Sequence, residues 1–208
     1  HLEHAQLALD KRLEDHNKRV EQIYFIERGA ASVVANAATR RPIEIGVIGR
    51  EGVTGLAVIM GVEQSPYDTF MQIAGDGWCM RATNLRRRMK DSATLQAALL
   101  RYAYGFAIQT AQTAICNGRN KIEERLARRL LMALDRAETD ALPLTHELLA
   151  RMLGVQRPGV TLALRLLEKR GLIRARRRAI RIIDREGLRR ISNGAYGVAE
   201  AELRRVSA

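Results

Sequence analysis

Three polar side chains spaced four residues apart, Arg157, Thr161 and Arg165, lie where one face of a helix would carry them, and Gln156 precedes them. Residues three or four positions apart lie on the same side of an α-helix. A glutamine amide or an arginine guanidinium can make paired hydrogen bonds to a base edge in the major groove, and a hydroxyl can contact several bases. These four residues are therefore the predicted base-reading set.

The segment from residue 144 to residue 184 has the signals of a winged helix-turn-helix that would position those side chains. Thr145 can cap a first helix, Gly154 allows a sharp turn, and Pro158 suits the first turn of a second helix. A strand, an arginine-rich turn and a second strand follow. Because helix-turn-helix patterns match loosely, a small helical hairpin with a solvated basic face is the alternative interpretation.

Positive charge is concentrated in the same segment. The chain has 35 Lys and Arg against 23 Asp and Glu, a net charge of +12. Residues 144–190 hold 13 basic against 4 acidic side chains, a net of +9, whereas residues 1–118 hold 14 against 12, a net of +2. Such concentration indicates a nucleic acid partner, and double-stranded DNA is the predicted one. The predicted phosphate contacts are Thr145, Lys169, Arg174, Arg176, Arg177 and Arg178.

Residues 92–118 are predicted to form one long helix, because the segment lacks proline and repeats apolar residues at helical spacing. Its apolar stripe carries no charge between Tyr102 and Cys116, so a second helix could approach closely. We expect a homodimer through this stripe, since such DNA readers commonly pair to span two half-sites. Packing within one chain would also explain the stripe. The predicted dimer residues are Leu95, Leu99, Tyr102, Phe106 and Thr113.

A further helix is predicted over residues 121–137, with apolar residues on its inner side. Its charged residues are expected to form a solvated outer surface with pairs at helical spacing. Arg50 and Glu51, in the glycine-rich stretch 49–55, are expected to pair at the surface or cap a turn. The charged helix residues are Glu123, Glu124, Arg125, Arg128, Arg129, Asp135 and Arg136.

The first ninety residues contain short runs rich in Ile, Val, Tyr and Phe, separated by glycine-containing segments such as Gly29 and residues 75–77. This spacing predicts a small antiparallel β-roll, and no strand alternates with a long helix as a doubly wound sheet would require. The predicted fold class is α+β. It comprises a jelly-roll-like β-roll over 1–91, a dimerisation helix over 92–118 and a winged helix-turn-helix domain over 119–208.

Together with this order of elements, three sequence stretches resemble the Crp/Fnr superfamily of bacterial transcription regulators over nearly the whole chain. They read IYFIERGAASVV, IEIGVIGREGVTG and EERLARRLLMALDRAETDALPLTHELLARMLGVQRPGVT. The helix-turn-helix and the ERLARRLL helix are the most specific parts. The resemblance implies a homodimer with a sensing roll, a dimer seam along the long helix, and a C-terminal domain on a palindromic operator. RNA polymerase is a further candidate partner.

The functional residues of the family carry over unevenly. Arg157 matches an arginine that family members direct at the operator, whereas Pro158 and Leu162 replace a glutamate and a second arginine found in other branches. In the roll, Leu56 stands where the family binds the ribose of a cyclic nucleotide, and residues 65–69 contain no arginine for the cyclic phosphate. The resemblance thus implies a cyclic-nucleotide-binding-like roll that lacks those residues, and the ligand of the roll stays unknown.

The sequence gives little support to other chemistry. Cys79 and Cys116 lie apart, outside any CxxC spacing, so we predict no disulfide, metal site or other cofactor. No catalytic spacing of histidines occurs and residues 49–55 lack the GKS/T of a P-loop, so we predict no enzyme. Haem ligation by His16 or His146 stays open.

No apolar run has the length of a membrane span, and no signal peptide is visible in the chain, which opens at His1. We therefore expect a cytoplasmic protein without a membrane partner. The main alternative to a sequence-specific DNA reader is a ligand-binding sensor whose basic domain binds RNA or DNA nonspecifically. The two differ in whether excess random DNA removes the protein from its site.

Overall fold

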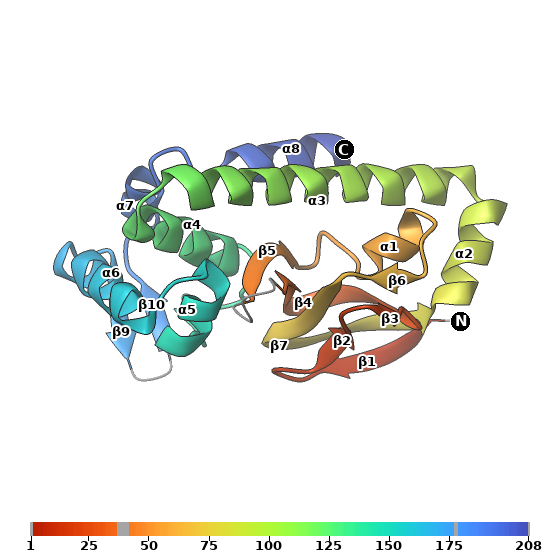
Figure 1. Cartoon of the computed structure of the whole chain (residues 1–208), viewed down its shortest axis with the longest axis horizontal. Coiled ribbons are helices and arrows are strands. Elements are labelled where there is room, and N and C mark those ends of the chain that lie inside the picture. The colour runs from red at the N-terminus through yellow and green to blue at the C-terminus, as the bar shows by residue number, and fades with distance from the viewer. Residues whose placement is uncertain (1, 37–41, 177–178, 208) are drawn as a thin grey trace.

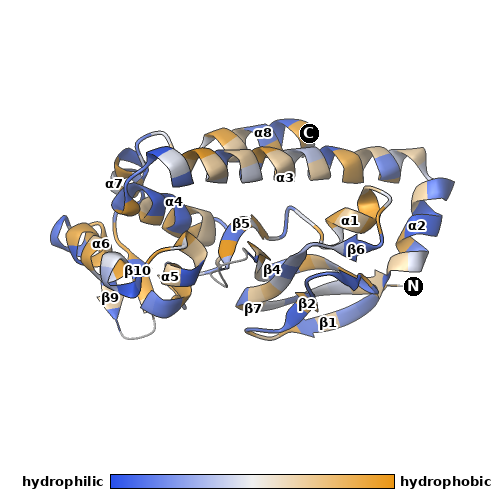
Figure 2. Ribbon diagram, in the orientation of Figure 1, coloured by the Kyte–Doolittle hydropathy of each residue, from blue (hydrophilic) through white to orange (hydrophobic). Residues whose placement is uncertain are grey.

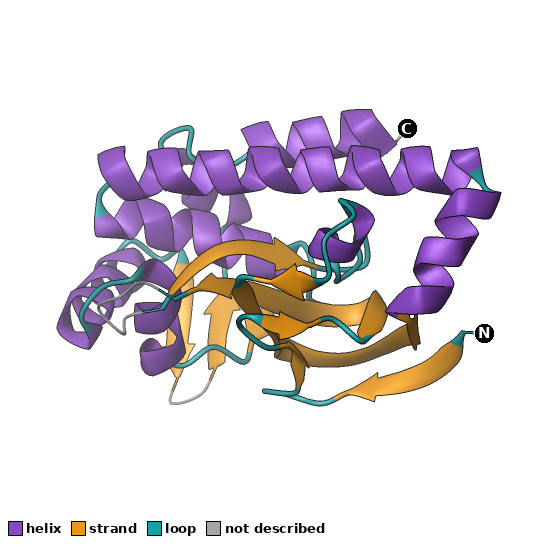
Figure 3. Cartoon of the chain, turned by 45° about the vertical axis from the view of Figure 1, so that its right-hand side comes forward, coloured by secondary structure: helices purple, strands orange, loops and turns teal. Residues whose placement is uncertain are grey.

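The computed structural model of the protein describes residues 2–36, 42–176 and 179–207. An antiparallel β-roll is followed by one long helix and then by a smaller domain of helices and short strands (Figures 1 and 3). The long helix spans the molecule from the roll to the smaller domain (Figure 1). The predicted α+β fold class is confirmed.

The roll is built on two long central strands, β4 (Gln22–Ala35) and β7 (Tyr67–Arg81), which pair with each other. The main sheet has the order β1-β7-β4-β5 with β2 also paired to β7, and all of its pairings are antiparallel. A separate ribbon joins β3 and β6, and the short helix α1 follows β5. The remaining elements are β1 (Glu3–Leu7), β2 (Arg12–Glu14), β3 (Lys18–Arg19), β5 (Ile43–Ile48), α1 (Leu56–Ile59) and β6 (Gln64–Ser65).

Gly29 and Gly75 lie inside the two central strands, so the expectation that these glycines separate shorter strands is wrong. Gly29 has a φ of +88°, and the β4–β7 register shifts on both sides of it. A Cβ at Gly29 would lie 2.5 Å from the carbonyl oxygen of Ile73, and one at Gly75 would overlap the carbonyl oxygen of Arg28. The two glycines therefore permit a bulge and a close strand approach within a continuous pair.

Two helices lead out of the roll, α2 (Ala82–Asp91) and the long α3 (Ala93–Arg119). The Ser92 hydroxyl caps α3 by accepting a hydrogen bond from the Leu95 backbone N–H at 3.2 Å. The C-terminal helix α8 (Val198–Ser207) packs along α3 (Figures 1 and 3). A Cβ at Gly105 would lie 2.5 Å from Cδ1 of Leu203, so the two helices approach closely at this glycine.

The predicted dimer stripe of α3 faces the roll of its own chain. Leu99, Tyr102 and Phe106 are buried, with 6%, 8% and 6% of their surface exposed. Phe106 covers Gly46 of β5, and Leu95 and Thr113 are half-buried. The assignment of Leu99, Tyr102 and Phe106 to a dimer interface is therefore wrong. Their large apolar surfaces are already removed from water by packing on the roll.

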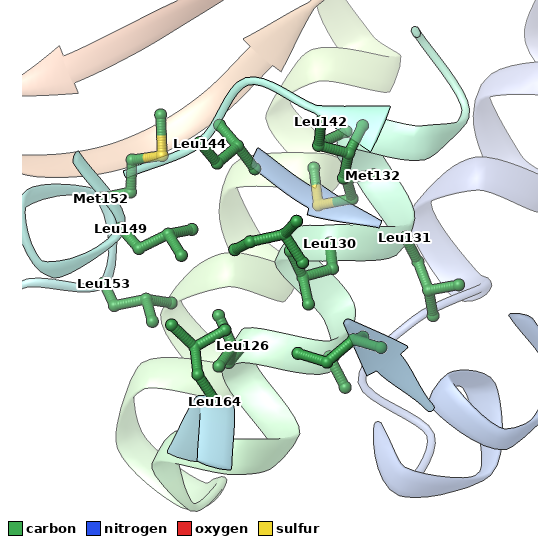
Figure 4. Packing of buried hydrophobic residues seen from close by; sticks show 14 of the residues in the cluster. Leu126, Leu130, Leu131, Met132, Leu142, Leu144, Leu149, Met152, Leu153 and Leu164 are labelled. Carbon is green, nitrogen blue, oxygen red and sulfur yellow. The ribbon is translucent and has the colours of Figure 1, made fainter. Parts of the chain in front are cut away.

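A second core, drawn in Figure 4, holds the C-terminal domain together. Helix α4 (Ile122–Leu134) contributes Leu126 and Leu130, which are fully buried beside Leu149 of α5 and Leu164 of α6. Burial of each leucine contributes roughly 1.5–3 kcal/mol. The other elements are β8 (Ala141–Leu142), α5 (His146–Leu153), α6 (Arg157–Lys169), β9 (Ile173–Arg176), β10 (Ala179–Ile182) and α7 (Arg185–Ile191).

A neighbouring side of α4 carries arginines that are buried against the roll, not solvated as expected. Arg129 Nε lies 2.5 Å from Glu44 Oε1 of β5, and the two side chains are 4% and 5% exposed. The Ser32 hydroxyl donates to Glu44 Oε2 at 2.5 Å, and Arg129 Nη2 also donates to Gln72 of β7. This network ties three strands of the roll, β4, β5 and β7, to the first helix of the C-terminal domain.

A second ion pair joins the loop after β5 to the residues just beyond α4. Arg136 Nε donates to Glu51 Oε1 at 2.8 Å, and the Arg136 side chain is 6% exposed. Burial acts to lower the pKa of Arg136, but the Glu51 carboxylate holds that pKa above its ordinary value. Glu51 also accepts from the Gly49 backbone N–H, which confirms the expected turn cap. Its ionic partner, however, is Arg136 and not Arg50.

Removing one partner of the buried Glu44–Arg129 pair should be costly, because the other charge is left buried alone. We expect Arg129→Met to lower the free energy of unfolding by about 3–5 kcal/mol. The double variant Glu44→Leu/Arg129→Met should recover most of that loss, since neither charge remains. Urea denaturation of the three proteins measures the difference.

The matched control is the exposed pair of Arg181 and Asp140, whose side chains are 64% and 62% exposed. Asp140→Asn should change the free energy of unfolding by less than about 1 kcal/mol. If Arg129→Met were as mild as this control, the buried pair would not hold the two domains.

Candidate DNA-binding surface

Helices α5 and α6 form the predicted helix-turn-helix, and each local signal acts as expected. Thr145 caps α5, its hydroxyl accepting from the Leu148 backbone N–H at 3.1 Å. Gly154 ends α5 with a left-handed φ of +62°. Pro158 lies in the first turn of α6, where its missing N–H leaves no hydrogen bond unmade. A Cβ at Gly154 would also lie 2.8 Å from Ile43 of β5, so the turn rests on the roll.

The outer face of α6 presents three of the four predicted base-reading residues to solvent. Gln156, Arg157 and Arg165 are exposed, while the opposite face of the helix is buried in the core. Leu162 lies on the same outer side and is 68% exposed. An exposed leucine has no packing reason to be there, but it can contact a thymine methyl group in a major groove.

Thr161 is half-buried, because its hydroxyl is bound inside the domain. The hydroxyl donates to the Arg157 carbonyl at 3.1 Å, and His146 Nδ1 of α5 lies 3.1 Å from it. This contact fixes the angle between the two helices of the motif. Thr161 therefore has a positioning role in the domain, and its base contact remains a prediction.

The predicted wing is a β-hairpin of β9 and β10, extended by β8. Arg174 and Arg176 of β9 are exposed, whereas Arg177 and Arg178 lie outside the described residues. Glu168 Oε1, near the end of α6, accepts from the Ala175 backbone N–H at 2.9 Å. The wing is therefore attached to α6, and its arginines move with that helix.

The other two predicted phosphate contacts lie at the ends of the helices. Lys169 is exposed in the last turn of α6, and Thr145 is half-buried at the start of α5. The Thr145 hydroxyl already accepts one hydrogen bond as a cap, and it retains a proton with which it can donate to a phosphate. Both phosphate contacts stay predictions.

In the roll, the segment that follows Ser65 carries an acidic hydrogen-bond network. Asp68 accepts hydrogen bonds from Arg12 at 2.7 Å and from Asn36 at 2.7 Å. Burial acts to raise the pKa of Asp68, but Asn36, the His16 N–H and Arg12 together hold it below its ordinary value. An ionised aspartate repels a phosphate. Leu56 begins helix α1, and the loss of cyclic-nucleotide-binding residues stays a prediction.

The two candidate haem histidines are both engaged in hydrogen bonds. His16 Nδ1 lies 2.8 Å from the Pro66 carbonyl and its Nε2 lies 2.9 Å from Asn17 Nδ2, while His146 contacts Thr161. Within the described residues, no group of three His, Cys, Asp or Glu side chains is placed to hold a metal ion. No described helix has both the length and the apolar character of a membrane span.

Comparison with known proteins assigns the C-terminal domain. Residues 124–191 match the family model described as the Crp-like helix-turn-helix domain. These residues form a Crp-like helix-turn-helix domain. The match begins in α4 and ends with α7, so it includes the motif, the wing and the helix that carries Arg129. No curated protein sequence matches the chain.

Solved structures of Crp/Fnr regulators share the fold of the whole chain. A CRP-family transcriptional regulator from Thermus thermophilus has a TM-score of 0.76 at 18% identity, covering 93% of this chain and 98% of that one. FixK2 from Bradyrhizobium japonicum has a TM-score of 0.75 at 17% identity, and the match covers 91% of this chain and 96% of that one. A second Thermus thermophilus regulator, of the CRP/FNR family, has a TM-score of 0.67 at 19% sequence identity. The match covers 93% of this chain and 100% of that one. The chain therefore has the Crp/Fnr fold.

Sequence reasoning missed three residues that hold the Crp-like domain in place. His146 orients α6 through Thr161, Arg129 joins α4 to the roll, and Arg125 donates to the Leu153 carbonyl at the end of α5. Arg125, Arg129 and Arg136 are spaced at four and seven residues on one helical side, and this spacing was the available signal. What it did not reveal is that the roll covers that side.

Thr145 offers a test that separates its cap from its predicted phosphate contact. Thr145→Ala should destabilise the domain by about 0.5–2 kcal/mol, because the Leu148 N–H loses its partner. Thr145→Ser keeps a capping hydroxyl and should restore stability. Thermal unfolding measures both variants, and a Thr145→Ala protein as stable as the wild type would contradict the capping role.

Proposed function

We propose that the protein is a sequence-specific DNA-binding transcription regulator that acts as a homodimer on a palindromic operator. One observation carries the proposal: the outer face of α6 in a Crp-like helix-turn-helix domain exposes Gln156, Arg157 and Arg165. Two guanidinium groups and an amide on one exposed helix face suit the donor and acceptor pattern of guanine and adenine in the major groove. The exposed wing cations Arg174 and Arg176 suit the flanking phosphates.

The remaining parts of the proposal follow from this role. The regulator acts in the cytoplasm, where bacterial DNA lies, and RNA polymerase is its further candidate partner. The ligand of the roll is unassigned, and the Asp68 network argues against a cyclic phosphate. Catalysis forms no part of the proposed role. The alternative function is a ligand-binding sensor that binds RNA or DNA nonspecifically. If an excess of random DNA displaced the protein from its site in a competition assay, that result would favour this alternative.

Arg157 should read a base, because it lies exposed at the N-terminal end of α6. Selection of bound sites from random DNA should yield a palindrome with the wild-type protein. Arg157→Ala should weaken binding to that site by about 1–3 kcal/mol and relax the preference at one base pair of each half-site. Fluorescence anisotropy with the selected site and single-base variants measures both effects.

The matched control is Arg176→Ala in the wing. It should weaken binding evenly across sequences and reduce the salt slope by about 1, as loss of a phosphate contact does. An even loss for Arg157→Ala as well would make Arg157 a phosphate contact and would contradict its assignment as a base reader.

The dimer interface we propose lies on the exposed face of α3 that neither the roll nor α8 covers. Within the described residues, no segment covers this face, and its apolar positions alternate at spacings of four and three. That is the repeat of a coiled-coil seam, and its many alanines let two helices approach closely. Leu100 and Tyr104, at 45% and 52% exposed, are its largest side chains. The α3 seam consists of Ala93, Ala97, Leu100, Tyr104, Ala107, Ala111, Ala114 and Gly118.

Ala107→Glu should break the dimer, because two buried glutamates would face each other at the centre of the seam. Analytical ultracentrifugation should show a dimer for the wild type and a monomer for the variant, with affinity for the palindrome reduced at least tenfold. Ala98→Glu, which is exposed on α3 but outside the seam, is the matched control and should remain dimeric. A dimeric Ala107→Glu protein would rule out this seam.

A further inference from the structure

Arg128 of α4 is buried without an acidic partner. Only 6% of its surface is exposed, and among the described residues no Asp or Glu forms an ion pair with it. Its Nε and one terminal nitrogen, Nη2, have no hydrogen-bond partner in the described part of the chain. Arginine keeps its proton in proteins, so burial cannot be relieved by neutralising it.

The side chains around Arg128 leave an excess of positive charge. Arg125, Arg128 and Arg129 line a common cavity that contains a single acidic side chain, Glu44. Glu44 is already paired with Arg129. Arg125 donates to the neutral carbonyl of Leu153, and its Nε has no partner in the described part. Two buried or half-buried guanidinium groups therefore lack a counter-charge.

Cys116, the other ionisable group on the cavity wall, does not supply that charge. Burial raises the pKa of its thiol, which points its Sγ toward the Ala195 carbonyl at 3.8 Å as a donor. A protonated thiol carries no charge. Among the described residues, no acidic side chain supplies the counter-charge of Arg128, and an isolated buried cation is strongly disfavoured.

We propose that this cavity binds a small inorganic anion of the size of chloride as the counter-ion of Arg128. The cavity has a volume of about 20 Å³. A single water needs roughly 10–15 Å³, so the cavity holds one small particle and is too small for phosphate, sulfate or a nucleotide. The donors are those that an anion requires, namely the unpartnered nitrogens of Arg128 and Arg125.

The position of the cavity gives the anion a role in joining the parts of the molecule. Its walls come from β5 of the roll, from α3, from α4, and from Met152 and Leu153 at the end of α5. An anion held there attracts two arginines of α4 across the boundary between the roll and the Crp-like domain. Its binding therefore stabilises the attachment of the helix-turn-helix to the rest of the chain.

Thermal unfolding in chloride and in gluconate, at constant ionic strength, tests the proposal. At a chloride concentration about ten times its dissociation constant, the midpoint of the wild type should rise by about 3–6 °C. Arg128→Met should fold without the buried charge and show no chloride-dependent rise. Arg87→Met, which removes an exposed arginine of α2, should respond like the wild type. An unchanged midpoint in the wild type, or an equal rise in Arg128→Met, overturns the site.

A second measurement does not depend on how stable the variants are. Rapid exchange of chloride with a protein site broadens the chloride NMR signal, so the wild type should broaden it and Arg128→Gln should lose at least half of that effect. Equal broadening by the two proteins overturns the proposal. Loss of the effect in Arg87→Met as well would show that only general surface charge attracts chloride.

Discussion

The buried pair of Glu44 and Arg129 is the interaction on which the relative position of the two domains depends. Two charges with only 5% and 4% of their side-chain surface exposed are stabilised by each other and by hydrogen bonds to buried neighbours, which offset part of the cost of removing them from water. Ser32 and Gln72, both fully buried, supply partners from two more strands of the roll. Any displacement of α4 from the sheet would separate these groups, and the cost would rise steeply in a medium of low dielectric constant.

Helix α4 is therefore shared by both domains, and its two sides have different chemistry. Leu126 and Leu130 on one side are fully buried in the core with α5 and α6. An adjacent side binds the roll through Arg129, and Arg136 continues that attachment to Glu51. Figure 2 shows the mixed hydropathy along this helix. Because α6 packs directly on α4, the ion pairs that fix α4 also fix the direction in which the base-reading face points.

Local sequence signals were sufficient to predict the helices and strands of the helix-turn-helix. They were not sufficient to predict the contacts between the elements of the fold. The helix caps and the turn depend only on residues close in sequence, so the roles of Thr145, Gly154 and Pro158 could be predicted. Helix α3 has two apolar faces, and periodicity alone does not say which one meets the roll. Tyr102 and Phe106 enter the core, whereas Leu100 and Tyr104 stay with the alanines on the exposed face, so residue size does not settle it either.

The prediction that the charged residues of α4 form a solvated surface was wrong for a related reason. In the sequence of a single helix, buried arginines cannot be told from the exposed arginines of a solvated face, because long charged side chains are normally exposed. This applies to Arg128, Arg129 and Arg136. The burial of Arg129 and Arg136 depends on Glu44 and Glu51, which are 85 residues earlier in the chain. Gly29 and Gly75 show the same limit, because a glycine that permits close strand approach looks in sequence like one that ends a strand.

These contacts also constrain how the roll could transmit a signal. A ligand shifts a conformational equilibrium only through contacts that differ between the two states. In the described residues, the charged contacts from the roll to α4 and its C-terminal end run through β5 and the loop after it, at Glu44 and Glu51. The same loop touches α3, because Gly52 lies against the ring of Tyr102. A signal that reorients the base-reading face through the roll must therefore move this strand and loop, and α3 with them. The roll, the proposed dimer helix and the proposed base-reading face are thus connected through β5 and the loop after it.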